Sequence, residues 1–142
     1  MEMYIVPFYF HRGDDFLRKE LPEHARMYGF PEVQVPEVTY DISDKSEISF
    51  GVQKMKIKHC PGHTPGHVVF YSESSNVLIA GDVLFQGSIG RTDFPRGSFQ
   101  QLKESIQKNL YVLPDETVVH SGHGPTTTIG VEARSNPFVT RL

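Results

Sequence analysis

The chain has a single cysteine, no tryptophan and no large excess of charge of either sign. One cysteine, Cys60, excludes an intramolecular disulfide and a thiolate-rich zinc site, and it fits a reducing compartment, so a cytoplasmic protein is expected. A net charge of -3 is too small to drive nucleic-acid binding. No apolar run approaches the roughly 20 residues that a membrane helix needs. Neither nucleic acid nor a membrane is therefore expected as a partner.

The composition is sufficient for one compact domain. A hydrophobic content of 38% in 142 residues supports a buried core, and no repeat, low-complexity tract or linker divides the chain. We therefore treat residues 1–142 as a single domain. Apolar residues recur at both helical and alternating spacing, which predicts an α/β fold.

The first half of the chain predicts a strand, two short helices and a ribbon. The strand covers residues 5–10, the first helix runs from Asp14 to Lys19, and a second begins at Pro22 and ends at Gly29. The following segment, 33–40, is broken by a proline and is predicted to cross the surface. In the ribbon over 48–58, apolar residues alternate with lysines, so one face is expected to meet solvent.

The second half predicts a hairpin, a helix and a further strand. Residues 67–73 and 76–80 are apolar runs separated by two serines, which is typical of a hairpin. Ser98 and Gln101 have the spacing of a helix-capping box. The apolar residues of that helix recur at helical spacing and are expected to pack on a sheet: Phe99, Leu102, Ile106 and Leu110. A β-branched strand follows at 116–120, and this order of elements favours a right-handed crossover between parallel strands.

Three glycine-rich loops carry the candidate functional residues. They are Pro61-Gly62-His63-Thr64-Pro65-Gly66-His67, Gly81-Asp82-Val83-Leu84-Phe85 with its continuation to Asp93, and Ser121-Gly122-His123-Gly124-Pro125. A hairpin returns to its starting edge and parallel strands end at the same edge, so His63, Asp82 and His123 are expected to meet there. Taken alone, each residue also fits an ordinary turn. Together, two imidazoles and a carboxylate predict a site for a divalent metal.

Other polar residues near these loops are assigned structural roles. His67 opens a strand and is interpreted as a hydrogen bonder that supports the ligands, while His59 and His120 are interpreted as strand-end histidines. Arg91 and Asp93 are expected to form an ion pair that holds their loop, in preference to direct catalysis. Cys60 lies in an apolar context and is interpreted as a small hydrophobic residue.

The three loops resemble the ligand loops of metallo-β-lactamase-fold hydrolases. From about Val6 to Asn136-Pro137-Phe138 the chain resembles the C-terminal two-thirds of the small glyoxalase II-like members. That family has an HxHxDH motif upstream of the first loop, and nothing between Met1 and His59 matches it. The resemblance implies a four-layer αβ/βα sandwich, of which this chain would supply the second sheet with its helices and part of the first.

The resemblance also implies a ligand set of seven residues for two metals, such as zinc, iron or manganese. A histidine matching His63 joins two histidines of HxHxDH at one metal, and one matching His123 joins the remaining two motif residues at the other. Asp82 matches the aspartate that bridges both metals and is the implied catalytic residue. Since this chain holds only three of the seven, we expect at most one weakly bound metal and little activity.

Two classes of function follow from the resemblance. The first is a truncated or fragmentary metal-dependent hydrolase, in whose intact relatives metal-bound hydroxide attacks a thioester or ester carbonyl. The second is an inactive remnant or a partner-binding module, and a mononuclear-iron sulfur dioxygenase is a further alternative. Apolar strands at Val68–Tyr71 and Val77–Ile79 would lose their cover without the upstream sheet. A homodimer, exchanging the strand at 5–10, or association with the missing N-terminal half is therefore expected.

Overall fold

The structure, a computed structural model, describes residues 6–142. Its helices are α1 (Asp15–Met27), α2 (Phe99–Ser105) and α3 (Ile129–Ser135), with short 3-10 and π turns η1 (Arg12–Asp14) and η2 (Ile106–Leu110). The strands are β1 (Tyr9–Phe10), β2 (Tyr40–Asp41), β3 (Glu47–Phe50), β4 (Gln53–His59), β5 (Val68–Ser72), β6 (Val77–Gly81), β7 (Leu84–Phe85), β8 (Ser88–Ile89), β9 (Val118–Ser121) and β10 (Thr127–Thr128). None of the helices in this part of the chain has the length and hydrophobicity of a membrane span.

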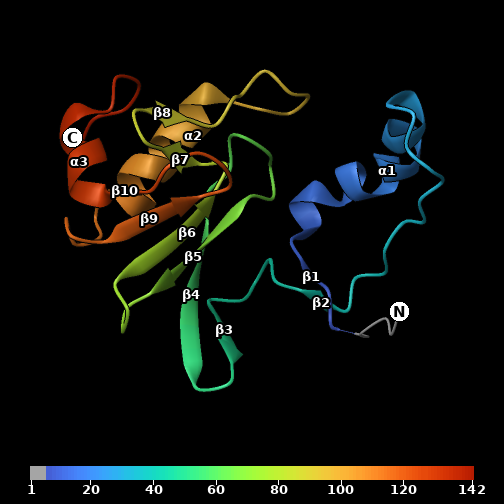
Figure 1. The fold of residues 1–142 in the computed structure, drawn as a ribbon, viewed down its shortest axis with the longest axis horizontal. Helices are drawn as coiled ribbons and strands as arrows, with labels where there is room; N and C mark the ends of the chain where they lie inside the picture. Colours follow the sequence, from blue (N-terminus) through green and yellow to red (C-terminus); the bar gives the residue numbers. More distant parts are fainter. Residues whose placement is uncertain (1–5) are drawn as a thin grey trace.

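Six strands form one mixed sheet in the order β10-β9-β6-β5-β4-β3. Strands β3 to β6 are antiparallel neighbours, which confirms the predicted ribbon and hairpin. β6 and β9 are parallel, with Leu78 opposite Val119, so the predicted strand–helix–strand crossover is also confirmed. Figure 1 shows α2 and α3 grouped beside this sheet. The α/β class predicted from the sequence is correct.

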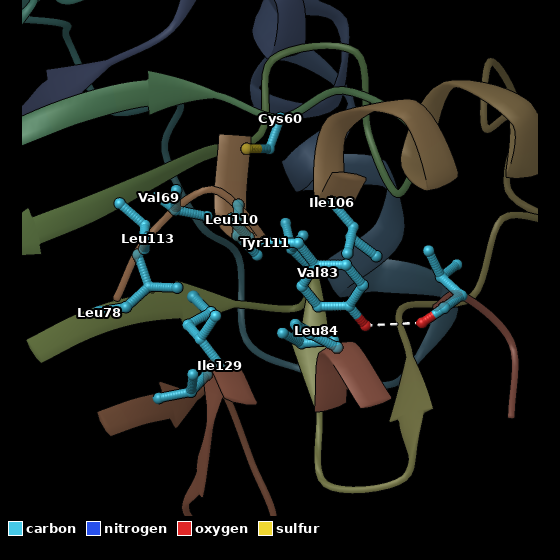
Figure 2. Close-up of a cluster of buried hydrophobic side chains, with 14 of the residues drawn as sticks. Cys60, Val69, Leu78, Val83, Leu84, Ile106, Leu110, Tyr111, Leu113 and Ile129 are labelled. Carbon is cyan, nitrogen blue, oxygen red and sulfur yellow. Dashed lines mark hydrogen bonds between the residues drawn. The ribbon is translucent and has the colours of Figure 1, made fainter. Parts of the chain in front are cut away.

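The core lies between the sheet and the helical segment α2–η2. Val69 and Leu78 from the sheet and Ile106 and Leu110 from η2 belong to one cluster, and all four are completely buried (Figure 2). Burying each such side chain contributes roughly 1.5–3 kcal/mol relative to leaving it exposed. Cys60 is also completely buried in this cluster, as expected for a small hydrophobic residue.

The start of α2 agrees with the predicted cap, but one expected core residue is exposed. The Ser98 hydroxyl accepts a hydrogen bond from the Gln101 amide at 3.3 Å, which satisfies a free donor of the first turn. The Phe99 side chain is 47% exposed, so the prediction that it packs on the sheet is wrong. Phe99 is the first helical residue, and burial begins one turn later at Leu102.

The other face of the sheet is partly exposed. Ile57, Phe70, Ile79 and His120 lie opposite one another in adjacent strands and therefore share a face. Ile79 is 46% exposed, whereas its neighbour Leu78, on the covered face, is completely buried. Because side chains alternate along a strand, only every second residue of the predicted apolar runs faces outward.

The N-terminal part differs from the prediction in its helices. Helix α1 is continuous from Asp15 to Met27 and contains Pro22, so the prediction of a second helix beginning at Pro22 is wrong. Proline removes one helical hydrogen bond, but the segment is helical on both sides of it, and Ala25, one turn later, is buried. The predicted end at Gly29 is confirmed: its φ is 72°, and the amide of Phe30 donates to the Ala25 carbonyl at 2.9 Å.

The opening strand is shorter than predicted. Within the described residues it is β1, which pairs in parallel with β2 outside the main sheet, while Ile5 of the predicted strand lies outside those residues. Residues 33–38 have no regular structure, as expected for a surface crossing. Figure 1 shows α1 set apart from α2 and α3, with the loop between β4 and β5 lying between α1 and the main sheet.

A buried polar cluster joins α3 to the β7–β8 hairpin. Glu132 is 1% exposed, and its carboxylate accepts hydrogen bonds from the Thr127 hydroxyl (2.6 Å), the Asn136 side-chain amide (2.8 Å) and the Gly87 backbone amide (3.0 Å). The Asn136 side chain also donates to the Ser88 carbonyl at 3.0 Å. Nothing in the sequence pattern predicted this cluster, because a lone glutamate on a short helix normally faces water.

Replacing Glu132 with alanine is expected to lower the free energy of unfolding by about 3 kcal/mol, since two buried donors and one partly buried donor would lose their acceptor. Chemical denaturation monitored by circular dichroism measures the change. Glu104→Ala is the control, because Glu104 is exposed on α2 and pairs only with its helix neighbours. Its loss should stay within about 0.5 kcal/mol. Equal losses for both variants would contradict the role of the cluster.

The partly exposed sheet face predicts self-association at micromolar concentration. Ile79→Lys places a charge at the centre of this face and is expected to shift the chain toward monomer. Light scattering measures the mass of both forms. Val52→Lys is the control, because Val52 is 94% exposed in the β3–β4 turn and lies off the face. A wild-type chain that stays monomeric would disprove the prediction.

Candidate functional site

Three predicted ligands meet at one edge of the main sheet. Asp82 follows the end of β6, and His123 lies two residues after the end of β9. The pairing of these strands places Gly81 opposite Ser121, and the Gly122 amide donates to the Gly81 carbonyl at 2.7 Å. His63 reaches the same place from the loop between β4 and β5. The expected convergence is therefore present, and metal binding by these residues stays a prediction.

The Asp82 carboxylate is flanked by the two histidines. His63 Nε2 lies 3.7 Å from Oδ2 of Asp82, and His123 Nε2 lies 3.8 Å from Oδ1. The side chains of His63, Asp82 and His123 are 14%, 38% and 77% exposed. Both N–O distances are too long for hydrogen bonds. Each gap between a histidine nitrogen and the facing carboxylate oxygen leaves room for an atom that contacts both.

His63 is oriented by a backbone carbonyl. Its Nδ1 lies 2.8 Å from the Arg91 carbonyl oxygen, which can only accept, so Nδ1 carries the hydrogen. In the neutral ring Nε2 then presents a lone pair toward Asp82. The Phe94 ring meets the imidazole edge-on at 5.4 Å. His63 is thus held in the tautomer that a metal ligand requires.

His67 holds the backbone of Asp82 in place by a hydrogen bond. Its Nε2 accepts a hydrogen bond from the Asp82 amide at 3.1 Å, in agreement with the predicted structural role. Burial, followed by the proximity of His63, lowers the pKa of His67, which favours its neutral form. Its Nδ1 is buried and has no hydrogen-bond partner within residues 6–142.

The loop that carries His63 is fixed by a residue distant in sequence. The Asp14 carboxylate, just before α1, accepts hydrogen bonds from the Thr64 hydroxyl and from the Gly66 amide, both at 2.6 Å. The backbone at Gly13 also passes close to that at Gly66, where a side chain would collide. This role of Asp14 is not predictable from the sequence, because about 50 residues separate the partners and no local pattern links them.

The interpretation of Arg91 and Asp93 is confirmed. Two hydrogen bonds, of 2.7 and 2.8 Å, join the guanidinium to the carboxylate, and both side chains are largely exposed. The hydrogen bonds from Arg91 lower the pKa of Asp93 to about 2. The Arg91 guanidinium also lies over the Phe94 ring, 4.2 Å from its centre. This contact stiffens the loop that positions His63.

The two strand-end histidines, His59 and His120, and the cysteine lie outside the ligand cluster. His59 ends β4, as predicted, and its ring stacks on His11 with centres 4.4 Å apart. His120 lies one residue before the end of β9. Burial raises the pKa of the Cys60 thiol to about 12, so this residue is unsuited to act as a nucleophile.

A cavity of about 510 Å³ opens over the three ligands. Its volume lies in the usual range for small-molecule sites. Its apolar walls come from Phe85, Ile89 and Phe94, which the sequence analysis did not single out as site residues. The Phe85 ring packs on the His123 imidazole at 4.5 Å and limits its movement. The β7–β8 hairpin, anchored by Glu132, therefore shapes one side of the cavity.

The donor set fits part of a metal centre but does not complete one. Among residues 6–142, no group of three or more histidine, cysteine, aspartate or glutamate side chains is arranged to hold a metal ion. His63 and His123 face different oxygens of Asp82, so the three side chains flank two positions with two donors each. A protein zinc site has at least three protein donors. Further donors are needed at both positions.

Because Gly122 has no side chain, the Asp82 carboxylate can lie directly beside it. A Cβ atom at this position would collide with Oδ1 of Asp82, so Gly122→Ala is expected to displace the carboxylate and to cost roughly 1–3 kcal/mol of stability. Backbone and imidazole NMR resonances of Asp82, His63 and His123 should shift. Gly51→Ala is the control for backbone strain alone: its φ of 57° disfavours alanine, but its Cβ would meet no atom within 4 Å and it lies in the β3–β4 turn, so the three sets of resonances should stay unchanged. Unchanged Asp82 resonances in Gly122→Ala would contradict this packing.

Comparison with known proteins identifies the family of this chain. The model of the metallo-beta-lactamase superfamily matches residues 4–123. The hydroxyacylglutathione hydrolase GloC of Haemophilus influenzae is 45% identical over 127 residues, which are 89% of this chain and 60% of GloC. The chain therefore spans less than two thirds of the length of this curated relative.

Solved structures give the same result. The BLEG-1 B3 metallo-beta-lactamase superposes with a TM-score of 0.83 at 38% identity over 95% of this chain and 66% of its own. TTHA1623, solved in a di-iron-bound form, superposes with a TM-score of 0.82 at 40% identity over 94% of this chain and 65% of its own. From the matched family model, these relatives and the ligand edge, the chain belongs to the metallo-beta-lactamase superfamily.

Proposed function

We propose that this chain carries half of the catalytic centre of a metal-dependent thioester or ester hydrolase of the glyoxalase II-like type. The observation that carries the proposal is the Asp82 carboxylate, with His63 beside one oxygen and His123 beside the other at the floor of a cavity. A divalent metal at such a site would supply Lewis-acid chemistry at a carbonyl. The similarity to a hydroxyacylglutathione hydrolase supports the substrate class.

The chain's own residues orient the ligands and shape the site. The Arg91 carbonyl sets the tautomer of His63, and the His67 ring holds the backbone of Asp82. Phe85 and Phe94 give the sides of the cavity apolar walls and leave room for an acyl group. Donors from outside these residues, such as an HxHxDH segment, would complete both metal positions. Zinc, iron and manganese all accept histidine and carboxylate ligands.

Experiments can distinguish two alternatives from the proposed hydrolase. An inactive remnant or partner-binding module would keep the fold and show no hydrolysis even with the missing donors supplied. A sulfur dioxygenase would require iron and consume oxygen. The di-iron form of TTHA1623 shows that iron occupies a relative of this chain, so the identity of the metal does not by itself distinguish the reactions.

The chain alone, given zinc, manganese or iron, is expected to hydrolyse a hydroxyacyl thioester no faster than background, because each metal position has only two donors. Co-expression with an N-terminal segment that carries HxHxDH should restore metal-dependent turnover. Asp82→Ala should then reduce the rate at least about a hundredfold. Release of free thiol, measured by a colorimetric reagent, provides the rate.

Asp44→Ala is the matched control, because Asp44 is an exposed carboxylate paired with Arg12 and does not line the cavity. Its rate should match that of the unmodified chain. Turnover by the 142-residue chain alone that disappears in Asp82→Ala would show that the chain needs no further donors. A restored protein that stays inactive with all three metals would favour the non-enzymatic alternative.

A further inference from the structure

A second cavity, of about 470 Å³, lies between α1 and the loop after β8. One wall comes from Phe16, Leu17, Met27 and Tyr28 of the α1 segment, and the other from Phe94 and Pro95. Met27 and Tyr28 are 73% and 78% exposed, so large apolar side chains stand open at its mouth. Exposed apolar groups that border a cavity are typical of a ligand site.

The two cavities share residues. His63 and Phe94 line both of them, so the second cavity lies next to the candidate ligand cluster. The Nε2 atom of His63 faces Asp82. The two cavities therefore adjoin at His63 and Phe94, and a molecule with its carbonyl at Asp82 has the second cavity as its neighbouring space.

Most of the residues around the second cavity are apolar. Two of its polar groups already have partners: the Thr64 hydroxyl donates to Asp14 at 2.6 Å, and Nδ1 of His63 is engaged with the Arg91 carbonyl at 2.8 Å. Glu20 and His24 also line the cavity; they lie 3.9 Å apart, too far for a hydrogen bond, and both are about half exposed, so they remain in contact with solvent. The other six lining residues are apolar, which favours an apolar occupant.

The walls are held in fixed positions. The Arg96 guanidinium lies over the Phe16 ring, 4.1 Å from its centre, and joins the loop to α1. Arg96 has a φ of 65°, a conformation that non-glycine residues rarely adopt and that its surroundings must maintain. Asp14 ties the start of α1 to the His63 loop. The cavity is thus preformed, which lowers the cost of binding.

We propose that this second cavity binds the apolar substituent, alkyl or aryl, of the ester or thioester whose carbonyl lies at Asp82. The inference rests on the proposed hydrolase function and adds the substrate class. An apolar cavity of roughly 150 Å³ holds benzene, so the space suffices for a ring or a branched chain. The substituent belongs either to the acyl group or to the thiol, and both have the same chemistry at this site.

The test measures binding without turnover, since the chain alone is expected to be inactive. Two series of thioesters are titrated into the isotope-labelled chain and followed by NMR. In one series the acyl group grows from acetyl to hexanoyl on N-acetylcysteamine, and in the other an S-alkyl group grows on an acetyl. Each buried methylene strengthens binding by up to about fourfold, so at least a tenfold gain along one series is expected.

Met27→Gln is expected to remove most of this gain, because it replaces an apolar wall with an amide of similar size on an exposed position. Tyr28→Ser is a second variant of the same wall. Leu21→Gln is the matched control, because Leu21 is 40% exposed on α1 and does not line the cavity. Cooperative thermal unfolding checks that each variant is folded.

A gain along the acyl series assigns the cavity to the acyl group, and a gain along the S-alkyl series assigns it to the thiol; either supports the proposal. No gain in either series, or an equal loss in Leu21→Gln, overturns it. The outcome is independent of hydrolysis. Length-dependent binding with an inactive restored protein would disprove the hydrolase function and leave the cavity assignment intact.

Discussion

The parallel pairing of β6 with β9 is the constraint on which the candidate site depends. It aligns the ends of two strands that are about 40 residues apart, so Asp82 and His123 leave the sheet side by side. The register continues one step beyond the ladder, because the Gly122 amide donates to the Gly81 carbonyl. Parallel strands require a crossover, and the buried helical segment α2–η2 supplies both that crossover and the core beneath the sheet.

Two carboxylates then attach the outer segments to this edge. Asp14 joins the start of α1 to the loop that carries His63, and Glu132 joins α3 to the hairpin that lines the first cavity. Both accept hydrogen bonds from backbone amides and hydroxyls, which are short and strong when the acceptor is charged. Loops alone would leave the ligands mobile, whereas these anchors fix them from two sides.

Much of the sheet and the convergence of the ligands were predictable from local patterns. Alternation, the serine turn and the Ser98 cap indicate elements directly, and topology rules then place His63, Asp82 and His123 together. The continuity of α1 through Pro22 was not predictable, because proline is as typical of a helix start as it is rare in a helix interior. The roles of Asp14 and Glu132 depend on partners about 50 and 45 residues away, which no local pattern encodes.

The residues around Asp82 divide between two proposed tasks, holding a metal and binding an apolar substituent. Each oxygen of Asp82 faces one histidine, so a metal bound at either position would need donors beyond these three residues. The second cavity, by contrast, has apolar walls that this chain supplies: they are built by α1 and the Phe94 loop and tied by Asp14 and Arg96. His63 borders both spaces. Selectivity for an apolar substituent can therefore reside in these residues even where the reacting centre requires further ligands.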